Sequence, residues 1–146
     1  MQGADERVRR GVLAVIAGVS YNSEVGGATA SPEFAAETAV VQDADRLEAV
    51  GAIGIARCLT YGGAKKRPLY DAEDLDPVAR EALLARTLTK EEYAAHSETA
   101  VGHFYAKLLR LRGMMKTAAG RRVAAARHDF MVAFLDQLFG EIAGQR

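Results

Sequence analysis

The chain has 146 residues, of which 49% are hydrophobic and 26% are charged, as is usual for a soluble globular domain. Lysine plus arginine and aspartate plus glutamate balance at 19 each, so bulk charge gives no argument for binding nucleic acid or a membrane surface. The single cysteine, Cys58, excludes an internal disulfide framework. No apolar run reaches the roughly 18 residues of a membrane span and no signal-peptide cleavage site is evident, so we expect a cytoplasmic location.

Hydrophobic periodicity predicts helices throughout the chain and no strands, so the expected fold class is all-α. A first helix is predicted over residues 5–19, with an apolar stripe formed by Val8, Val12, Val15, Ile16 and Val19. Residues 20–32 are predicted to form a loop, because they contain Asn22, Gly26, Gly27 and Ser31. Ser31 as cap and Pro32 in the first turn then predict the start of a second helix.

The second helix is predicted to cover residues 32–59. It is apolar almost all round after Leu47, which is typical of a buried helix. Gly51 and Gly54 each cost a helix about 1 kcal/mol relative to alanine. We therefore expect a close helix–helix or helix–ligand approach at these two glycines.

The second half of the chain begins with a glycine-hinged basic loop over residues 61–70 and an acidic turn over residues 71–77. A short helix is predicted over residues 77–88. Two long amphipathic helices are expected to follow. The first contains Val101, Phe104, Tyr105, Leu108, Leu111 and Met115. The second covers residues 117–142 and is expected to bury Val123, Phe130, Phe134 and Leu138.

Three carboxylates, Asp43, Asp45 and Glu48, stand just before the apolar part of the second helix. Asp43 and Asp45 diverge by about 200° on a helix and cannot share one ligand, whereas Asp45 and Glu48 can share a face. A carboxylate facing a helical core is a possible oxygen ligand for a divalent ion. Local spacing alone favours the simpler interpretation, in which these acids form solvated ion pairs with neighbouring arginines.

The three carboxylates belong to a longer sequence motif. Residues 41–57, VQDADRLEAVGAIGIAR, resemble the last motif of the small HD-domain metal-dependent phosphohydrolases. The resemblance continues in family order through the segments VIAGVSY (residues 15–21), YGGAK (61–65), RPLYD (67–71), HFYAKLLRL (103–111), MKT (115–117) and RHDFM (127–131). It covers nearly the whole chain, and the motif around Asp45 is long and specific.

The resemblance implies a helical HD-type fold and a metal site made of a histidine, a His-Asp pair and a final aspartate. That final aspartate corresponds to Asp45, with Asp43 behind it. Mn²⁺ or Mg²⁺ would activate water against the phosphate ester or anhydride of a nucleotide-like substrate. Lys65 and Lys66 on the basic loop are expected to neutralise phosphate charge, with Arg46 as a further substrate-binding residue.

The sequence departs from the family pattern in its histidines. None precedes Asp45, although the family's histidine and His-Asp pair lie upstream of the final aspartate. The dipeptide His128-Asp129 comes after Asp45, so we expect a packing or capping contact there. His96 and His103 show no ligand spacing, and His103 is interpreted as a structural histidine. Glu48 also replaces the family's usual aspartate.

One carboxylate cannot hold a catalytic divalent ion tightly. We therefore expect residues 1–146 to form a partial HD-type phosphohydrolase domain, incomplete at its N-terminus and inactive by itself. The chain would be a gene fragment, a degenerate paralogue, or one half of a complex completed by another chain. The alternative function is a non-catalytic helical interaction module, which dimerises or binds a partner through the uncovered apolar face of residues 40–55. A nucleotide-binding regulator without hydrolysis stands between the two.

Overall fold

A computed structural model describes residues 2–21, 24, 27 and 31–145, and these residues form helices and no strands. The all-α fold class is therefore confirmed. No helix among the described residues is both long enough and apolar enough to cross a membrane. The elements are α1 (Gln2–Val19), η1 (Pro32–Phe34), α3 (Ala35–Leu47), α4 (Gly51–Ala64), α5 (Ala72–Leu75), α6 (Pro77–Ala85), α7 (Lys90–His96), α8 (Ala100–Ala106), η2 (Leu108–Met114) and α9 (Ala118–Ile142).

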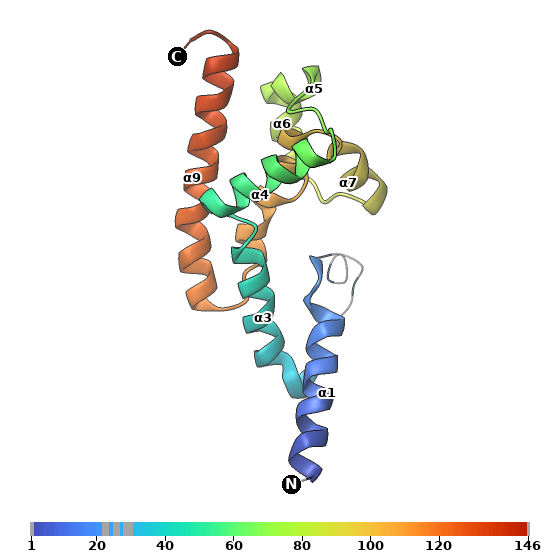
Figure 1. Cartoon of the computed structure of the whole chain (residues 1–146). Coiled ribbons are helices and arrows are strands. Elements are labelled where there is room, and N and C mark those ends of the chain that lie inside the picture. Colours follow the sequence, from blue (N-terminus) through green and yellow to red (C-terminus); the bar gives the residue numbers. More distant parts are fainter. Residues whose placement is uncertain (1, 22–23, 25–26, 28–30, 146) are drawn as a thin grey trace.

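Helix α1 lies against α3, and its N-terminal end extends away from the other helices (Figure 1). Its contact face is made by small residues: a Cβ on Gly11 would lie 2.9 Å from the Phe34 ring. The predicted apolar stripe lies beside this contact and lines an open groove against α3, so Val12 and Ile16 remain 52% and 62% exposed. Of the predicted loop that follows, Asn22, Gly26 and part of the remainder lie outside the described residues.

The prediction of one helix over residues 32–59 is wrong. Ser31 and Pro32 do start a helical turn, η1, although the Ser31 hydroxyl makes no capping hydrogen bond. The chain then breaks between α3 and α4, and Gly51 has a φ of 75°, a left-handed conformation that side chains disfavour. Arg127 of α9 holds this break: its guanidinium donates to the Leu47 carbonyl at the end of α3.

The expected close approach to another helix is confirmed at Gly51, whereas at Gly54 the close neighbour is the chain's own backbone just before α4. A Cβ on Gly51 would lie 2.9 Å from the Arg127 side chain, and one on Gly54 would lie 2.3 Å from the Ala49 carbonyl oxygen. Full burial of α4 is not observed, because Ile53 is 51% exposed. Helix α4 packs on one side against α8 and α9 and leaves its other side open.

The core forms where α4, α8, η2 and α9 meet. Its buried members are Val50, Ile55, Val101, Phe104, Leu108, Leu109, Leu111, Met115, Ala124, Met131 and Leu135. The predicted long helix through residues 101–115 is instead α8 followed by the 3-10 helix η2. The two are separated at Lys107, whose φ of −136° and ψ of −61° are not helical.

Helix α9 begins and ends within a residue of its predicted limits. Its start is fixed by Thr117, whose hydroxyl oxygen accepts a capping hydrogen bond from the Gly120 N–H at 2.9 Å. Its predicted buried face is partly wrong. Met131 is buried, whereas Phe130, one residue and about 100° earlier, is 54% exposed. The narrow face that meets α3 and α4 includes the small residues Gly120 and Ala124, which allow the helices to approach closely.

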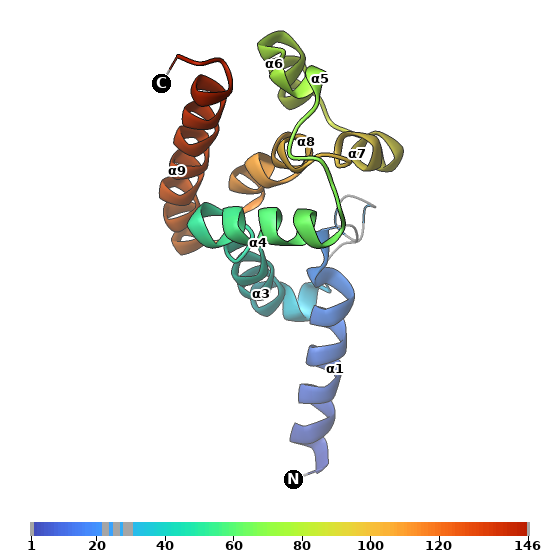
Figure 2. The same ribbon diagram turned by 45° about the horizontal axis from the view of Figure 1, so that its top comes forward.

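The predicted short helix near residue 77 is confirmed as α6, capped by the Asp76 carboxylate. The short helix α7 was not predicted from the sequence. Thr89 and Glu92 form a capping box at its start, and its Tyr93 packs against Leu83 and Leu88. Figure 2 shows α4 running from α9 toward α7, with α8 alongside, so the three helices α4, α7 and α8 converge.

Candidate functional site

A pocket of about 570 Å³ lies where α4, α7 and α8 converge. Helix α4 contributes Arg57 and Tyr61, which are four residues apart and therefore share one face. His103 and Lys107 have the same spacing, with Lys107 immediately after α8. The walls also include Cys58, Arg67, Tyr93, Ser97 and Glu98.

The loop after α4 is anchored to the start of α8, and this anchoring fixes one wall of the pocket. The backbone N–H groups of Ala100 and Val101 donate to the carbonyls of Pro68 and Leu69, each at 2.9 Å. These bonds satisfy N–H groups that a helix start would otherwise leave without a partner. Arg67, one residue before this contact, is thereby held at the pocket.

Two half-buried cations on the pocket wall, Lys107 and Arg67, make no direct ion pair with a carboxylate among the described residues. The Lys107 ammonium lies 4.8 Å from the centre of the Tyr21 ring, and the Arg67 guanidinium lies 5.7 Å from that of Tyr61. Burial lowers the pKa of Lys107, while the nearby Asp45 carboxylate opposes this effect. A half-buried cation without a direct ion pair is costly, so this wall favours an anionic ligand.

His103 lies on the same pocket wall, close enough to both cations for their charges to affect its pKa. Its pKa is lowered to about 4, mainly because burial disfavours the imidazolium, with smaller effects from the charges of Lys107 and Arg67. Its Nδ1 lies 3.2 Å from the Ser97 hydroxyl oxygen. The ring is therefore neutral near pH 7 and fixed in orientation by a buried serine.

Asp45, the predicted metal ligand, is exposed on α3 and makes no described hydrogen bond or ion pair. Its carboxylate is close enough to Lys107 to affect that residue's pKa, which places it near the pocket. The described part of the chain contains no group of three or more His, Cys, Asp or Glu residues able to hold a metal ion. These residues alone therefore do not fit a catalytic divalent ion.

Asp43, the second predicted catalytic residue, is 3% exposed and is occupied by structural hydrogen bonds. It accepts from the Lys116 N–H at 2.7 Å, and from the N–H and hydroxyl of Thr117 at 2.8 and 2.7 Å. Burial would raise the pKa of Asp43, but these hydrogen bonds outweigh burial and hold the pKa below its usual value. Asp43 thus joins α3 to the start of α9.

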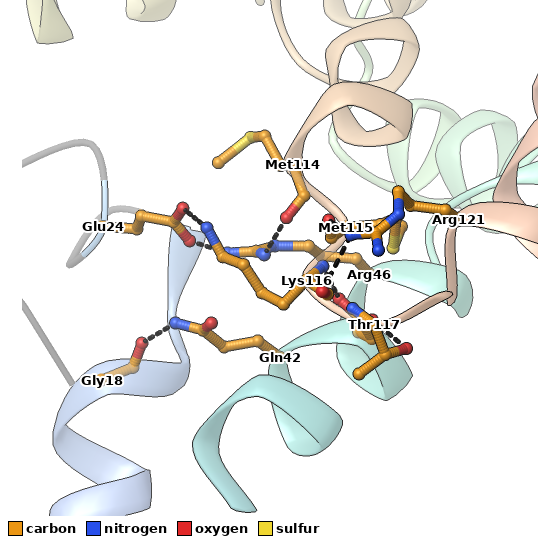
Figure 3. Close-up of polar contacts among 10 residues, drawn as sticks. Gly18, Glu24, Gln42, Arg46, Met114, Met115, Lys116, Thr117 and Arg121 are labelled. Carbon is orange, nitrogen blue, oxygen red and sulfur yellow. Dashed lines mark hydrogen bonds and ion pairs between the residues drawn. The ribbon is translucent and has the colours of Figure 1, made fainter. Parts of the chain in front are cut away.

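Arg46, predicted to bind substrate, is 2% exposed and is held by the protein itself (Figure 3). Its guanidinium donates to the Met114 carbonyl at 2.8 Å and pairs with Glu24, which also pairs with Lys116. Gln42, one turn earlier on α3, donates to the Gly18 carbonyl at 2.8 Å. These contacts join α3 to α1 and to the end of η2, and the described contacts give no support for substrate binding by Arg46.

Lys65 and Lys66, the other predicted substrate-binding residues, are exposed at the end of α4 and do not line the pocket. Lys65 stands 5.8 Å from the centre of the Tyr61 ring, at the pocket's outer edge. Lys66 has a φ of 56° and turns the chain. The next residue, Arg67, lines the pocket instead.

The dipeptide His128-Asp129 makes packing contacts between α9 and η2. The His128 imidazole hydrogen-bonds the backbone of Leu109, and its pKa is lowered mainly by burial. The Asp129 carboxylate lies 3.4 Å from the Arg112 guanidinium. These positions agree with the contact expected from the sequence.

Sequence reasoning missed the polar and aromatic residues that line the pocket, among them Arg67, Tyr93, Ser97 and Lys107, and it assigned His103 a structural role. Spacing along the chain could not reveal them, because the pocket forms from three helices distant in sequence. One available signal was that Arg67, His103 and Lys107 all lie inside segments that carry the family resemblance.

Comparisons with known proteins agree with the HD-like arrangement, although no family model matches the sequence. The uncharacterized protein YpgQ of Bacillus subtilis is 36% identical over 133 residues, covering 91% of this chain and 52% of YpgQ. A crystal structure from Lactobacillus plantarum superposes with a TM-score of 0.71 at 36% identity, over 91% of this chain and 60% of that one.

Two further structures carry information on function. An HD-superfamily hydrolase from Bacillus thuringiensis matches with a TM-score of 0.56 and 38% identity, over 77% of this chain and 50% of that one. YpgQ in complex with ADP matches with a TM-score of 0.54 and 38% identity, over 72% of this chain and 43% of that one. The chain spans about half the length of YpgQ. Its helices are similar in sequence and arrangement to part of an HD-superfamily hydrolase.

Proposed function

We propose that this chain supplies the phosphate-binding part of an HD-type, metal-dependent phosphohydrolase that acts on nucleotide-like phosphate esters or anhydrides. The observation that carries the proposal is the pair of half-buried cations, Lys107 and Arg67, which line one pocket and make no direct ion pair among the described residues. Two of the similar structures support it: one is an HD-superfamily hydrolase, and the other is YpgQ in complex with ADP.

The pocket suits a ligand that has both charge and a flat ring. The rings of Tyr61 and Tyr93 both line the pocket; Tyr61 lies 5.7 Å from the Arg67 guanidinium, and Tyr93 stands 5.9 Å from Tyr21, measured between ring centres. Aromatic side chains offer stacking area to a base, and cations pair with phosphate oxygens. Glu98 is the one carboxylate among the residues that line the pocket, and it is exposed.

Hydrolysis would require a bound metal ion, whereas nucleotide binding at the pocket would not. Asp45 is proposed as one metal ligand, but the described residues offer no second and third ligand beside it. A divalent ion would therefore need ligands from another polypeptide segment. We accordingly expect this chain by itself to bind a nucleotide without hydrolysing it.

The proposal is tested by titrating ADP into the purified chain in a calorimeter and by measuring phosphate release with Mn²⁺ present. Lys107→Met and Arg67→Gln remove the charges while keeping much of each side chain's bulk, and each should weaken ADP binding about tenfold. Arg122→Gln, an exposed arginine on α9, is the matched control and should leave the affinity unchanged. No ADP binding by the unaltered chain, or equal losses in all three variants, would contradict the proposal.

A helical interaction module is the second candidate, and a specific surface favours it. An open groove of about 330 Å³ lies between helices α1 and α3, and its lining is almost entirely apolar. Its lining includes large exposed side chains: Val8, Val12, Ile16 and Val41. Contiguous apolar patches on protein surfaces mark interaction sites, so this face would bind a second copy or a partner chain.

A further inference from the structure

Besides Lys107 and Arg67, the pocket contains a row of uncharged polar groups that come from α7, the residue after it and α8. Ser97 is 7% exposed and contacts both the Tyr93 hydroxyl and the His103 Nδ1. All three residues line the pocket. The rings of Tyr93 and His103 are 6.1 Å apart between centres, so the three side chains form one wall.

The number of protons limits how Tyr93, Ser97 and His103 can donate hydrogen bonds to one another. A serine hydroxyl has a single proton to donate, as has a tyrosine hydroxyl. If the Tyr93 hydroxyl donates to Ser97, the Ser97 proton is free to go to His103 Nδ1. The imidazole proton then sits on Nε2, which makes no described hydrogen bond and is not among the described buried atoms that lack a partner.

We propose that His103 is a further ligand-binding residue of this pocket, a neutral imidazole oriented by Ser97 that donates its Nε2–H to a phosphate oxygen held between Lys107 and Arg67. The inference rests on the proposed function, because it places the phosphate in this pocket. The ring is neutral because burial, together with the nearby charges of Lys107 and Arg67, lowers its pKa to about 4. Donation by a neutral group adds direction to the attraction that the two cations supply without adding a third charge.

His103 and Ser97 have different roles in this proposal. His103 contacts the ligand, whereas Ser97 acts through His103 and is a positioning residue. Removing the serine hydroxyl leaves the imidazole in place but allows its proton to move to Nδ1. A nitrogen without a proton would then face the phosphate, and two acceptors repel each other.

The test measures the affinities of the full chain for ADP and for adenosine. One variant keeps an aromatic ring at residue 103 without the hydrogen-bond donor, and another keeps a donor without the ring. His103→Phe keeps a flat ring and removes the donor, and we expect about tenfold weaker ADP binding with adenosine binding unchanged. His103→Gln keeps an amide donor near the Nε2 position and should stay within about threefold of the parent chain. Circular dichroism and thermal melting check that each variant is folded.

Ser97→Ala has a readout that a merely structural role would not move. Long-range ¹H–¹⁵N spectra of the His103 ring should show the proton on Nε2 in the parent chain and a mixture of tautomers in the variant. If His103→Phe binds ADP as tightly as the parent while Lys107→Met and Arg67→Gln weaken binding, this inference fails and the proposed function stands. If none of these variants changes ADP binding, both fail.

Discussion

The Asp43 carboxylate accepts two hydrogen bonds from Thr117, one from its backbone N–H at 2.8 Å and one from its hydroxyl at 2.7 Å. Thr117 is also the N-cap of α9, since its hydroxyl oxygen accepts from the Gly120 N–H. One aspartate on α3 therefore fixes the residue that starts the longest helix described. The carboxylate resembles a catalytic acid in sequence, but its contacts are structural.

Asp43→Asn should lower the free energy of unfolding by about 2–4 kcal/mol, because the amide would turn a donor toward backbone N–H groups that need an acceptor. Urea unfolding followed by circular dichroism measures the change. Asp45→Asn, two residues away and exposed, is the control and should stay within about 0.5 kcal/mol of the parent chain. Equal stabilities for the two variants would contradict the structural role of Asp43.

Gly120→Ala should also destabilise the chain, by about 1–3 kcal/mol, because the new Cβ would lie 2.2 Å from an Asp43 carboxylate oxygen. Asp43 cannot move away without losing its hydrogen bonds to Thr117. Gly113→Ala is the matched control, since nothing lies within 4 Å of a Cβ there. Thermal melting of both variants checks the prediction, and a neutral Gly120→Ala would show that Asp43 can shift freely.

The fold was predictable where local signals determine it, as in α9, which a threonine cap and regular periodicity define. The break between α3 and α4 was not predictable, because it depends on Gly51 adopting a left-handed conformation beside Arg127. The candidate site shows the same contrast between residues that a local sequence motif indicates and residues that distant contacts bring together. Asp45 could be proposed from the sequence because its motif is continuous, whereas His103 and Lys107 acquire their surroundings only when α4, α7 and α8 converge. Arg46 was misjudged because its carbonyl partner, Met114, lies 68 residues later.

His103 predicts a measurable dependence of stability on pH. Its pKa in the folded chain is about 4, against an ordinary value of 6.5, so between these pH values the unfolded chain binds a proton that the folded chain does not. The stability associated with neutral His103 is therefore complete above pH 6.5 and decreases as the pH falls toward 4. His103→Gln should remove this part of the decrease in urea titrations from pH 7 to pH 4. Parallel curves for parent and variant would show that His103 titrates normally.

The apolar groove between α1 and α3 predicts self-association. Ile16 lines this groove and is 62% exposed, so Ile16→Glu should reduce association while changing the free energy of unfolding by only about 0.5 kcal/mol. Light scattering after size exclusion distinguishes the 15.7 kDa monomer from larger species across a concentration series. A parent chain that stays monomeric at every concentration would remove the support for an interaction module formed by two copies.

The central claim, that the pocket between α4, α7 and α8 binds phosphate-bearing nucleotides, is tested most directly by following ¹H–¹⁵N amide shifts during an ADP titration. The account predicts saturable shifts centred on Arg67, Ser97, His103 and Lys107, which are lost in Lys107→Met and retained in Arg122→Gln. Shifts confined to Lys65 and Lys66, or to the groove between α1 and α3, would contradict it, as would the absence of any shift in the folded chain.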